Sequence, residues 1–278
     1  MFKNLALVVV FFASVIFATV EVASSQEKEI RIEGSTTVGP IVDAFVEAMK
    51  QSDLGVRFTV KKTGSGDGAA ALIDGRCEVA AMSRFMKDEE YKKAVNVGRK
   101  PIPFTICMDG VCFIVHPSNK INNLTKVQVK DIYVGKIKSW KELGGADIPI
   151  VAISRDTSSG TYEVFHELAV SKAKLGNSVE YTNSNPQMFT RVSTTKGAIG
   201  YVGIGFLQEG VSAVRFEGIS PTPETVSSGV YLLSRPLYLF TDGYPKAGSP
   251  LMKFCNFFLT EEGQDVIKAK GFVPFTKY

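Results

Sequence analysis

The segment Gly34-Ser35-Thr36-Thr37-Val38-Gly39-Pro40 decides the fold that we expect, because of the sequence on either side of it. Apolar and polar residues alternate from Ile30 to Glu33, which predicts a strand, and apolar residues recur at helical spacing from Ile41 to Met49. Pro40 suits the first turn of a helix, where its missing N–H costs no hydrogen bond. The segment therefore predicts a hydroxyl-rich loop between the carboxyl end of a strand and the N-terminus of a helix.

The same order of strand, polar loop and helix recurs along the chain. Three more strands are followed by polar groups: Val56–Val60 before TGSGDG (63–68), Glu78–Met82 before Ser83 and Arg84, and Ile148–Ser154 before RDTSSGT (155–161). Strands that alternate with helices predict an α/β fold. In an open α/β sheet, ligands bind beyond the carboxyl ends of the strands. We therefore expect the four loops to lie together at one site.

The rest of the chain continues the alternation without a long linker or an internal repeat. We expect strands near 105–116, 197–202 and 231–240, and helices at 127–133, 162–170 and 250–269. Nearly 280 residues can form one large domain or two of ordinary size.

Composition excludes several classes of protein. The 278 residues are 45% hydrophobic and 22% charged, which excludes a disordered tail, a collagen-like fibre and a coiled coil. The net charge is +4, and basic residues occur only in dispersed pairs. Nucleic-acid binders usually carry a clustered basic stripe, so we expect no nucleic-acid partner.

The N-terminus has the pattern of a secretory signal peptide. Lys3 precedes an apolar run from Leu5 to Val20, and small and polar residues follow near Ser24. The run of 16 residues is shorter than the roughly 20 that span a bilayer, although an uncleaved anchor remains the alternative. Residues 1–24 are thus predicted to be a signal peptide. No cysteine lies at the cleavage position, so we expect an exported protein that is not a lipoprotein.

The cysteines raise a second expectation for an exported chain. Cys107 and Cys112 flank Met108-Asp109-Gly110-Val111, and Asp-Gly between strand-like residues is a strong signal for a two-residue hairpin. Such a hairpin would bring the two side chains close together. A Cys107–Cys112 disulfide is one prediction, and two buried thiols are the alternative. Cys77 and Cys255 could also pair, which the sequence does not decide.

Motifs for catalysis are not supported by their context. Ser171–Lys174 and Ser193–Lys196 match S-x-x-K and residues 62–64 match K-T-G, but K-T-G precedes both serines and no Ser-Asp-Asn occurs. The two histidines, His116 and His166, have no metal-ligand spacing. We therefore predict no catalytic residues, no metal and no cofactor.

The loops favour binding of an anion. Backbone N–H groups at helix N-termini point toward negative charge, and Ser and Thr hydroxyls add donors. Arg155 adds a planar, permanently charged fork for an oxyanion. For any single loop, an ordinary helix cap is the alternative explanation. Four such loops on one chain, one with an arginine, predict an anion site.

At these loops the chain resembles PstS-like proteins, the phosphate-binding subunits of bacterial ABC transporters. The matching pieces are GSTTVGP (34–40), GSGDG (64–68), Ser83-Arg84, SRDTSSGT (154–161) and KGAIGY (196–201). The resemblance implies a type II periplasmic-binding-protein fold, with two α/β lobes and the ligand in the cleft between them. Lobe I would comprise 27–110 plus 232–278, and lobe II 111–231.

The resemblance also implies the ligand, the partners and the site. The chain would be a periplasmic monomer that captures inorganic phosphate and delivers it to a membrane ABC permease. The alternatives are binding of another tetrahedral oxyanion, such as sulfate or molybdate, and an exported phosphatase-like enzyme. The residues carried over as phosphate ligands are Ser35, Thr36, Thr37, Ser65, Ser83, Arg155, Ser159, Gly160 and Thr161.

One departure from the family pattern concerns the acceptor of the phosphate proton. Some family members have an aspartate at the end of the third strand, where this chain has Arg84. A carboxylate there rejects sulfate, which has no proton to donate. Asp67 and Asp156 are candidates to replace it, and their alternatives are a helix cap and a partner that orients Arg155. Arg84 either contacts the ligand or pairs with an acidic neighbour.

Overall fold

The computed structural model describes residues 28–50 and 54–275, so the predicted signal peptide lies outside the described residues. The strands are β1 Lys28–Gly34, β2 Val56–Lys62, β3 Val79–Met82, β4 Pro101–Val115, β5 Asn123–Leu124, β6 Val151–Arg155, β7 Glu180–Thr182, β8 Ala198–Gly203, β9 Ser212–Phe216 and β10 Ser234–Asp242. The α-helices are α1 Gly39–Lys50, α2 Ser65–Ile73, α3 Asp88–Asn96, α4 Lys126–Tyr133, α5 Gly160–Val164, α6 Asn185–Ser193, α7 Pro223–Ser227, α8 Pro250–Asn256 and α9 Glu261–Ala269. Within these ranges, no helix has both the length and the apolar character that crossing a membrane requires.

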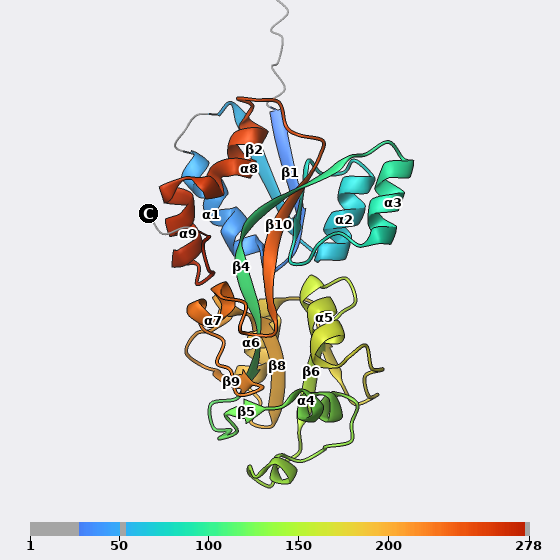
Figure 1. Ribbon diagram of the computed structural model, residues 1–278, viewed down its shortest axis with the longest axis vertical. Helices are drawn as coiled ribbons and strands as arrows, with labels where there is room; N and C mark the ends of the chain where they lie inside the picture. The colour runs from blue at the N-terminus through green and yellow to red at the C-terminus, as the bar shows by residue number, and fades with distance from the viewer. Residues whose placement is uncertain (1–27, 51–53, 276–278) are drawn as a thin grey trace, which may run out of the picture.

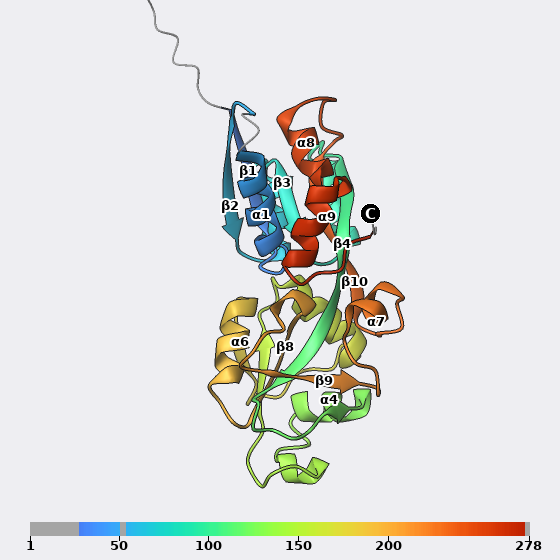
Figure 2. The same ribbon diagram turned by 90° about the vertical axis from the view of Figure 1, so that its left-hand side faces the viewer.

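The fold is α/β with two lobes, as expected (Figure 1). One path of strands runs β2-β1-β3-β10-β4-β8-β6-β7, and β5 and β9 pair beside it. In the upper lobe of the view, β1 lies parallel to β2 and β3, while α1, α8 and α9 flank one side and α2 and α3 the other. The lower lobe contains β5 to β9 with α4 to α7, and the turned view shows the same division (Figure 2).

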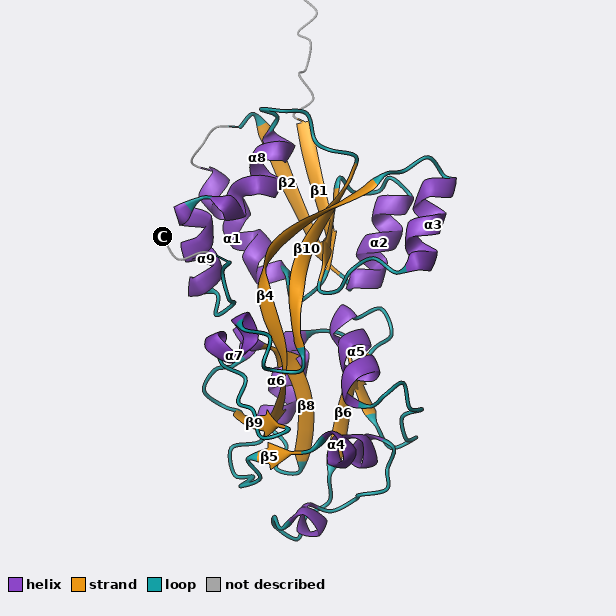
Figure 3. Cartoon of the chain, in the orientation of Figure 1, coloured by secondary structure: helices purple, strands orange, loops and turns teal. Residues whose placement is uncertain are grey.

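Two long strands connect the lobes. β4 pairs antiparallel with β10 from Pro101 to Gly110, and then with β8 and β9 from Val111 to Val115. Figure 3 shows β4 and β10 running side by side from the upper lobe toward the lower one. The change of partner falls between Gly110 and Val111, so a single strand belongs to the sheets of both lobes.

The hairpin and the disulfide predicted around Asp109-Gly110 are wrong. β4 continues through both residues, and Cys107 and Cys112 are free, buried thiols. Five residues of extended strand separate their Cα atoms by roughly 16 Å, whereas a disulfide needs less than about 7 Å. Cys77 and Cys255 are free and buried as well. Burial raises the pKa of the Cys107 and Cys112 thiols well above their ordinary value.

Both residues of the Asp-Gly pair have a structural role other than a turn. Asp109 is fully buried in an ion pair. A Cβ on Gly110 would lie 2.8 Å from a methyl carbon of Val226, so α7 packs against a position without a side chain. The pair therefore reflects tertiary contacts, which local turn statistics do not include.

Two predicted helices are interrupted in the structure. Residues 250–269 form α8, a short 3-10 turn at Phe257–Leu259 and α9. The break is at Thr260, whose hydroxyl accepts a hydrogen bond from the Gly263 N–H and caps α9. Residues 162–170 form the end of α5 and a π-helical turn, Phe165–Ala169. The expected strand near 231–240 is β10, which begins three residues later, at Ser234.

Candidate anion-binding site

One small cavity lies where the loops after β1, β3 and β6 meet the starts of α2 and α5. The empty space between its atoms is about 120 Å³, counted together with the open solvent at its mouth. The lining residues are Ser35, Thr36, Thr37, Gly64, Ser65, Ser83, Arg155, Ser159, Gly160 and Thr161. All nine residues carried over as phosphate ligands are therefore brought together, although they come from four separate parts of the sequence.

Local hydrogen bonds hold the loops in place at the helix starts. The Ser35 hydroxyl accepts from the N–H groups of Thr37 (3.1 Å) and Val38 (3.3 Å) just before α1. The Ser159 hydroxyl caps α5 by accepting from the Tyr162 N–H at 3.2 Å. Each serine hydroxyl thus accepts backbone N–H bonds as a helix cap does, while its own proton stays available to a ligand.

Arg155 supplies the positive charge of the cavity. Its side chain is at the end of β6 and the residue is 1% exposed. The Nε atom donates to the Thr182 carbonyl (3.2 Å) and Nη2 donates to the Asn183 carbonyl (2.8 Å). Nη1 is buried and has no hydrogen-bond partner in the part of the chain that the structure describes. Burial lowers the pKa of Arg155 from its ordinary value, yet a guanidinium stays protonated in proteins. The cavity lining therefore contains a buried positive charge with an unused donor, which an anion bound there would satisfy.

The two walls of the cavity contact each other directly. The Thr37 and Thr161 hydroxyls lie 2.9 Å apart, and the Gly66 N–H donates to the Ser158 carbonyl at 2.9 Å. Gly160 has no room for a side chain, because a Cβ would lie 2.5 Å from the Ser65 Oγ and 2.7 Å from the Ser83 Oγ. The cavity is therefore enclosed, and an ion held there is surrounded by groups from both walls.

Asn185, at the start of α6, is a site residue that sequence reasoning missed. It is fully buried, and its Nδ2 donates to the Thr36 hydroxyl (3.2 Å) and the Thr37 hydroxyl (2.9 Å). Its Oδ1 accepts from the Gly203 N–H at 3.3 Å, which fixes the orientation of the amide. In sequence it reads as part of an ordinary Ser-Asn-Pro helix start, so no local signal distinguishes it.

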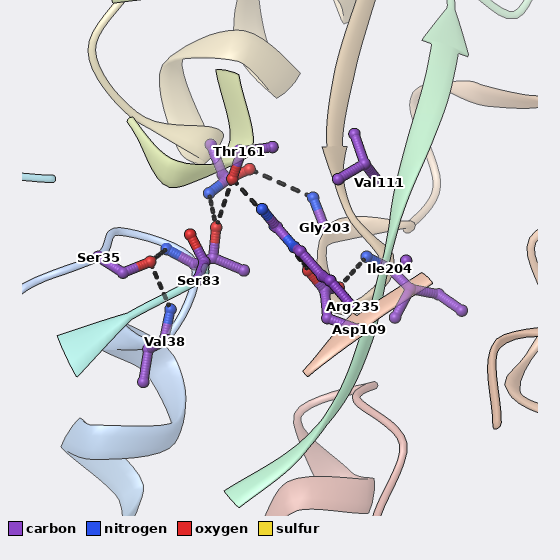
Figure 4. Close-up of polar contacts among 12 residues, drawn as sticks. Ser35, Val38, Ser83, Asp109, Val111, Thr161, Gly203, Ile204 and Arg235 are labelled. Atoms are coloured by element: carbon purple, nitrogen blue, oxygen red, sulfur yellow. Dashed lines mark hydrogen bonds and ion pairs between the residues drawn. The ribbon is translucent and has the colours of Figure 1, made fainter. Parts of the chain in front are cut away.

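Asp109 and Arg235 were missed as well, and they support Thr161 (Figure 4). The Arg235 Nε and Nη2 donate to the Asp109 Oδ2 at 2.8 and 2.7 Å, and Nη2 also donates to the Thr161 hydroxyl at 3.0 Å. The Asp109 Oδ1 accepts from the Ile204 N–H at 2.9 Å. Burial raises the pKa of the Asp109 carboxyl, and Arg235 beside it opposes that rise. The pair links β4 and β10 to the cavity wall.

The three further candidates do not line the cavity. Arg84 forms ion pairs with Glu90 (2.7 Å) and Glu163 (2.6 Å). Of the two roles considered for Arg84, pairing with an acidic neighbour is therefore the one seen in the structure. The Asp156 Oδ1 accepts from the backbone N–H and the hydroxyl of Ser158, and its Oδ2 is buried without a hydrogen-bond partner among the described residues. Asp67 lies in the first turn of α2.

In residues 28–50 and 54–275, no three His, Cys, Asp or Glu side chains are arranged to hold a metal ion.

Comparison with known proteins identifies the family. Residues 19–262 match the model of the PBP superfamily domain. The chain is 34% identical over 257 residues to the phosphate-binding protein PstS of Staphylococcus epidermidis, covering 88% of this chain and 78% of that protein. It is 30% identical over 258 residues to PstS of Borreliella burgdorferi, covering 89% of this chain and 90% of that one.

Solved structures agree. A putative phosphate ABC transporter substrate-binding protein from Clostridium perfringens, solved with bound phosphate, is 35% identical with a TM-score of 0.81, covering 90% of this chain and 100% of that one. An ABC-type phosphate transport receptor from Vibrio cholerae is 30% identical with a TM-score of 0.72, covering 88% and 99%. On the evidence of the cavity, the fold and these relatives together, the chain belongs to the PstS family of phosphate-binding proteins within the PBP superfamily.

Proposed function

We propose that this chain binds one inorganic phosphate ion in the cavity and delivers it to a membrane ABC permease. The observation that carries the proposal is Arg155, a buried cation in the cavity lining that has neither an ion pair nor a partner for its Nη1 among the described residues. A phosphate oxygen would accept a charge-assisted hydrogen bond from that atom. Seven hydroxyl side chains in the lining add further donors. The bound phosphate of the Clostridium perfringens relative supports the choice of anion.

The nine carried-over residues are the proposed ligands, in two groups. Ser35, Thr36, Thr37, Ser65 and Ser83 would contact the ion from lobe I, and Arg155, Ser159, Gly160 and Thr161 from lobe II. We assign 27–110 plus 232–278 to lobe I and 111–231 to lobe II. The change of partner along β4, between Gly110 and Val111, supports the first of these boundaries. Closure of the lobes would remove the ion from water.

The protein would act as an exported monomer that binds without catalysis. An empty space of about 120 Å³ is well below the roughly 300–1,000 Å³ of pockets for larger organic ligands, which favours a small ion. The lining offers hydroxyls and a guanidinium, which stabilise an anion, rather than an activated nucleophile with an adjacent base. Export would follow from the signal peptide predicted at 1–24.

Calorimetric titration of the purified chain with phosphate tests the proposal. We expect one ion bound per chain, no turnover of a chromogenic phosphate ester above a buffer blank, and the mass of a monomer in solution. Absence of binding, or two equivalent ions per chain, contradicts the single-cavity model. Turnover that depends on added metal contradicts the transport assignment.

A further inference from the structure

A further concavity lies beside α5 in the lower lobe (Figure 1), and none of its lining residues lines the anion cavity. Its empty space is about 760 Å³, counted together with the open solvent at its mouth. Pockets for organic ligands occupy roughly 300–1,000 Å³. We name this concavity the aromatic pocket, and its lining includes Tyr162, His166, Lys174, Gly176, Asn177 and Tyr181.

Three rings contribute to the lining of the aromatic pocket. The rings of Tyr162 and His166 are stacked, with centroids 5.0 Å apart and planes at 15°. His166 belongs to the π turn Phe165–Ala169, a helix form that is frequent at functional sites. Burial raises the pKa of Tyr162 and the neighbouring Tyr181 adds to the rise, so the two tyrosines lie near each other. Tyr181 is 57% exposed, and its ring therefore offers a face on which a flat ligand can stack.

The loop 171–177 completes the pocket and is held in place by backbone hydrogen bonds. The Gly176 N–H donates to the Tyr133 carbonyl at 2.9 Å, and the Lys172 N–H donates to the His166 carbonyl at 2.7 Å. Ser171 and Lys172 have φ angles of 53° and 60°, in the left-handed region that side chains disfavour. Strained backbone of this kind persists only where the surrounding structure enforces it, and it clusters at ligand sites. The pocket is therefore preformed.

The polar groups of the lining are not used by the protein itself. The His166 Nε2 lies 3.0 Å from the Ala173 carbonyl, which can only accept, so Nε2 carries the proton and Nδ1 of the neutral ring keeps a lone pair. Within residues 28–50 and 54–275, this Nδ1 has no hydrogen-bond partner. The same holds for the polar side-chain atoms of Tyr162, Lys174, Asn177 and Tyr181. Several donors and acceptors thus surround one space without internal partners.

The charge beside the rings is positive. Lys174 lines the pocket and forms no ion pair with any described residue. The acidic side chains nearest to the lining in sequence are already paired, Glu163 with Arg84 at 2.6 Å and Glu167 with Lys172 at 3.0 Å. Aromatic rings alone would also suit a cation, but the ammonium group of Lys174 favours a ligand with a negative group.

We propose that the aromatic pocket binds a nucleoside monophosphate as a second ligand of this chain. The base stacks on Tyr181, and the phosphate group accepts from the Lys174 ammonium. The ribose hydroxyls bond with His166 and Asn177. The aromatic pocket has room for a base and a sugar, whereas the empty space of the anion cavity is only about 120 Å³. Since the two sites share no lining residue, the inference does not rest on the proposed function.

Calorimetric titration with adenosine 5′-monophosphate in excess phosphate tests the inference, because phosphate keeps the nucleotide out of the anion cavity. We expect one nucleotide per chain, with a Kd in about the millimolar range, since one stacked base and one exposed charge contribute little more. Adenosine should bind roughly twofold to fivefold more weakly, because it lacks the phosphate group. Ribose 5-phosphate should bind at least about fivefold more weakly, because it lacks the base.

Two variants separate the ring from the charge. Tyr181→Ala should weaken binding of the nucleotide and of adenosine alike, by at least about fivefold, because both carry the base. Lys174→Gln should weaken binding of the nucleotide alone, by roughly twofold to fivefold, and so bring it to the affinity of adenosine. Tyr91→Ala and Lys93→Gln on α3, in the upper lobe, are the matched controls and should change neither affinity. All four side chains are exposed, so the variants should fold.

Three results would overturn the inference. One is the absence of nucleotide binding up to about ten times the expected Kd. Another is nucleotide binding that occurs only without phosphate, which would place the nucleotide in the anion cavity. The third is an unchanged nucleotide affinity in Tyr181→Ala, or an equal loss in Tyr91→Ala. Failure of wild type to bind phosphate would refute the proposed function and leave the nucleotide titration as a valid test of the aromatic pocket.

Discussion

Arg155 and Arg235 are both buried beside the cavity, 1% and 4% exposed, but their charges are balanced in different ways. Arg235 is bonded through two nitrogen atoms to the Asp109 carboxylate. Arg155 is bonded to two neutral carbonyls and has no ion pair within the described residues, where the Nη1 atoms of both arginines are buried without a hydrogen-bond partner. Burying a charge is costly unless it is paired. The comparison indicates that the charge of Arg235 is balanced within the protein, whereas Arg155 is the arginine whose charge we propose that the ligand balances.

The largest expected effect is on stability, and it comes from removing the counter-charge of Arg235 so that this arginine, like Arg155, is buried without an ion pair. Asp109→Asn removes the carboxylate and leaves a buried guanidinium without its counter-charge. We expect the free energy of unfolding, measured by urea denaturation, to fall by about 3–5 kcal/mol. The double variant Asp109→Leu/Arg235→Met should recover much of this loss, because a buried pair can be replaced by apolar residues. A single variant within about 1 kcal/mol of wild type would show that the pair is not required.

The next effect is on binding and concerns Arg155. Arg155→Ala should weaken phosphate binding at least about tenfold, since charge-assisted hydrogen bonds contribute roughly 1.5–3 kcal/mol each. Calorimetry measures this, with Lys130→Ala on α4 as the control for loss of one positive charge outside the cavity lining. Equal phosphate affinity in wild type and Arg155→Ala would remove Arg155 from the site.

A third arginine, Arg84, sharpens the comparison because one of its partners is across the cavity. It pairs with Glu90 beside it and with Glu163 on α5, and their side chains are 7%, 16% and 18% exposed. We expect Glu163→Gln to raise the dissociation rate of phosphate about threefold to tenfold, because the Arg84–Glu163 pair joins the two walls and would hold them closed over the ion. Stopped-flow kinetics measures the rate. Glu90→Gln is the control, and an equal effect of both variants would contradict a role in closure.

The smallest effect is expected at an exposed pair, Arg99 with Asp242. Burial acts to raise the pKa of Asp242, but hydrogen bonds from Arg99 and from the Lys100 N–H outweigh it and lower the pKa. A lowered folded-state pKa stabilises above the unfolded value of about 3.9, and this contribution is lost as pH falls through the folded value. Asp242→Asn should therefore cost less than about 1 kcal/mol at pH 7, given solvent screening.

The measurement for this pair is the free energy of unfolding at pH 7 and at pH 3. We expect the difference between wild type and Asp242→Asn to shrink toward zero at the lower pH. A difference that grows on acidification would mean that the pKa is shifted in the other direction.

The cavity could be predicted from sequence because its lining comes from local motifs. Ser35, Ser65, Ser83 and Arg155 each lie close to a strand or helix end, so the order of elements predicted their loops, while the choice of individual residues came from the family resemblance. The strand and helix order followed from apolar periodicity for the same reason.

The residues behind the lining could not be predicted in this way. Asp109 and Arg235 are 126 positions apart, and Asn185 bonds residues 148 and 149 positions away. No local pattern encodes such contacts. The Asp-Gly pair even gave a misleading local signal, because burial in an ion pair and packing against α7 require the same two residues as a tight turn.

The position of β10 has a consequence for how the chain acquires its structure. β10 lies between β3 and β4, so the upper sheet contains a gap until residues 234–242 have been synthesised. Until then β3 and β4 each present an unpaired edge, which favours aggregation. The Asp109 carboxylate also has no guanidinium to meet during that time. Folding of the first lobe is therefore expected to be late and non-local, and slow as a result.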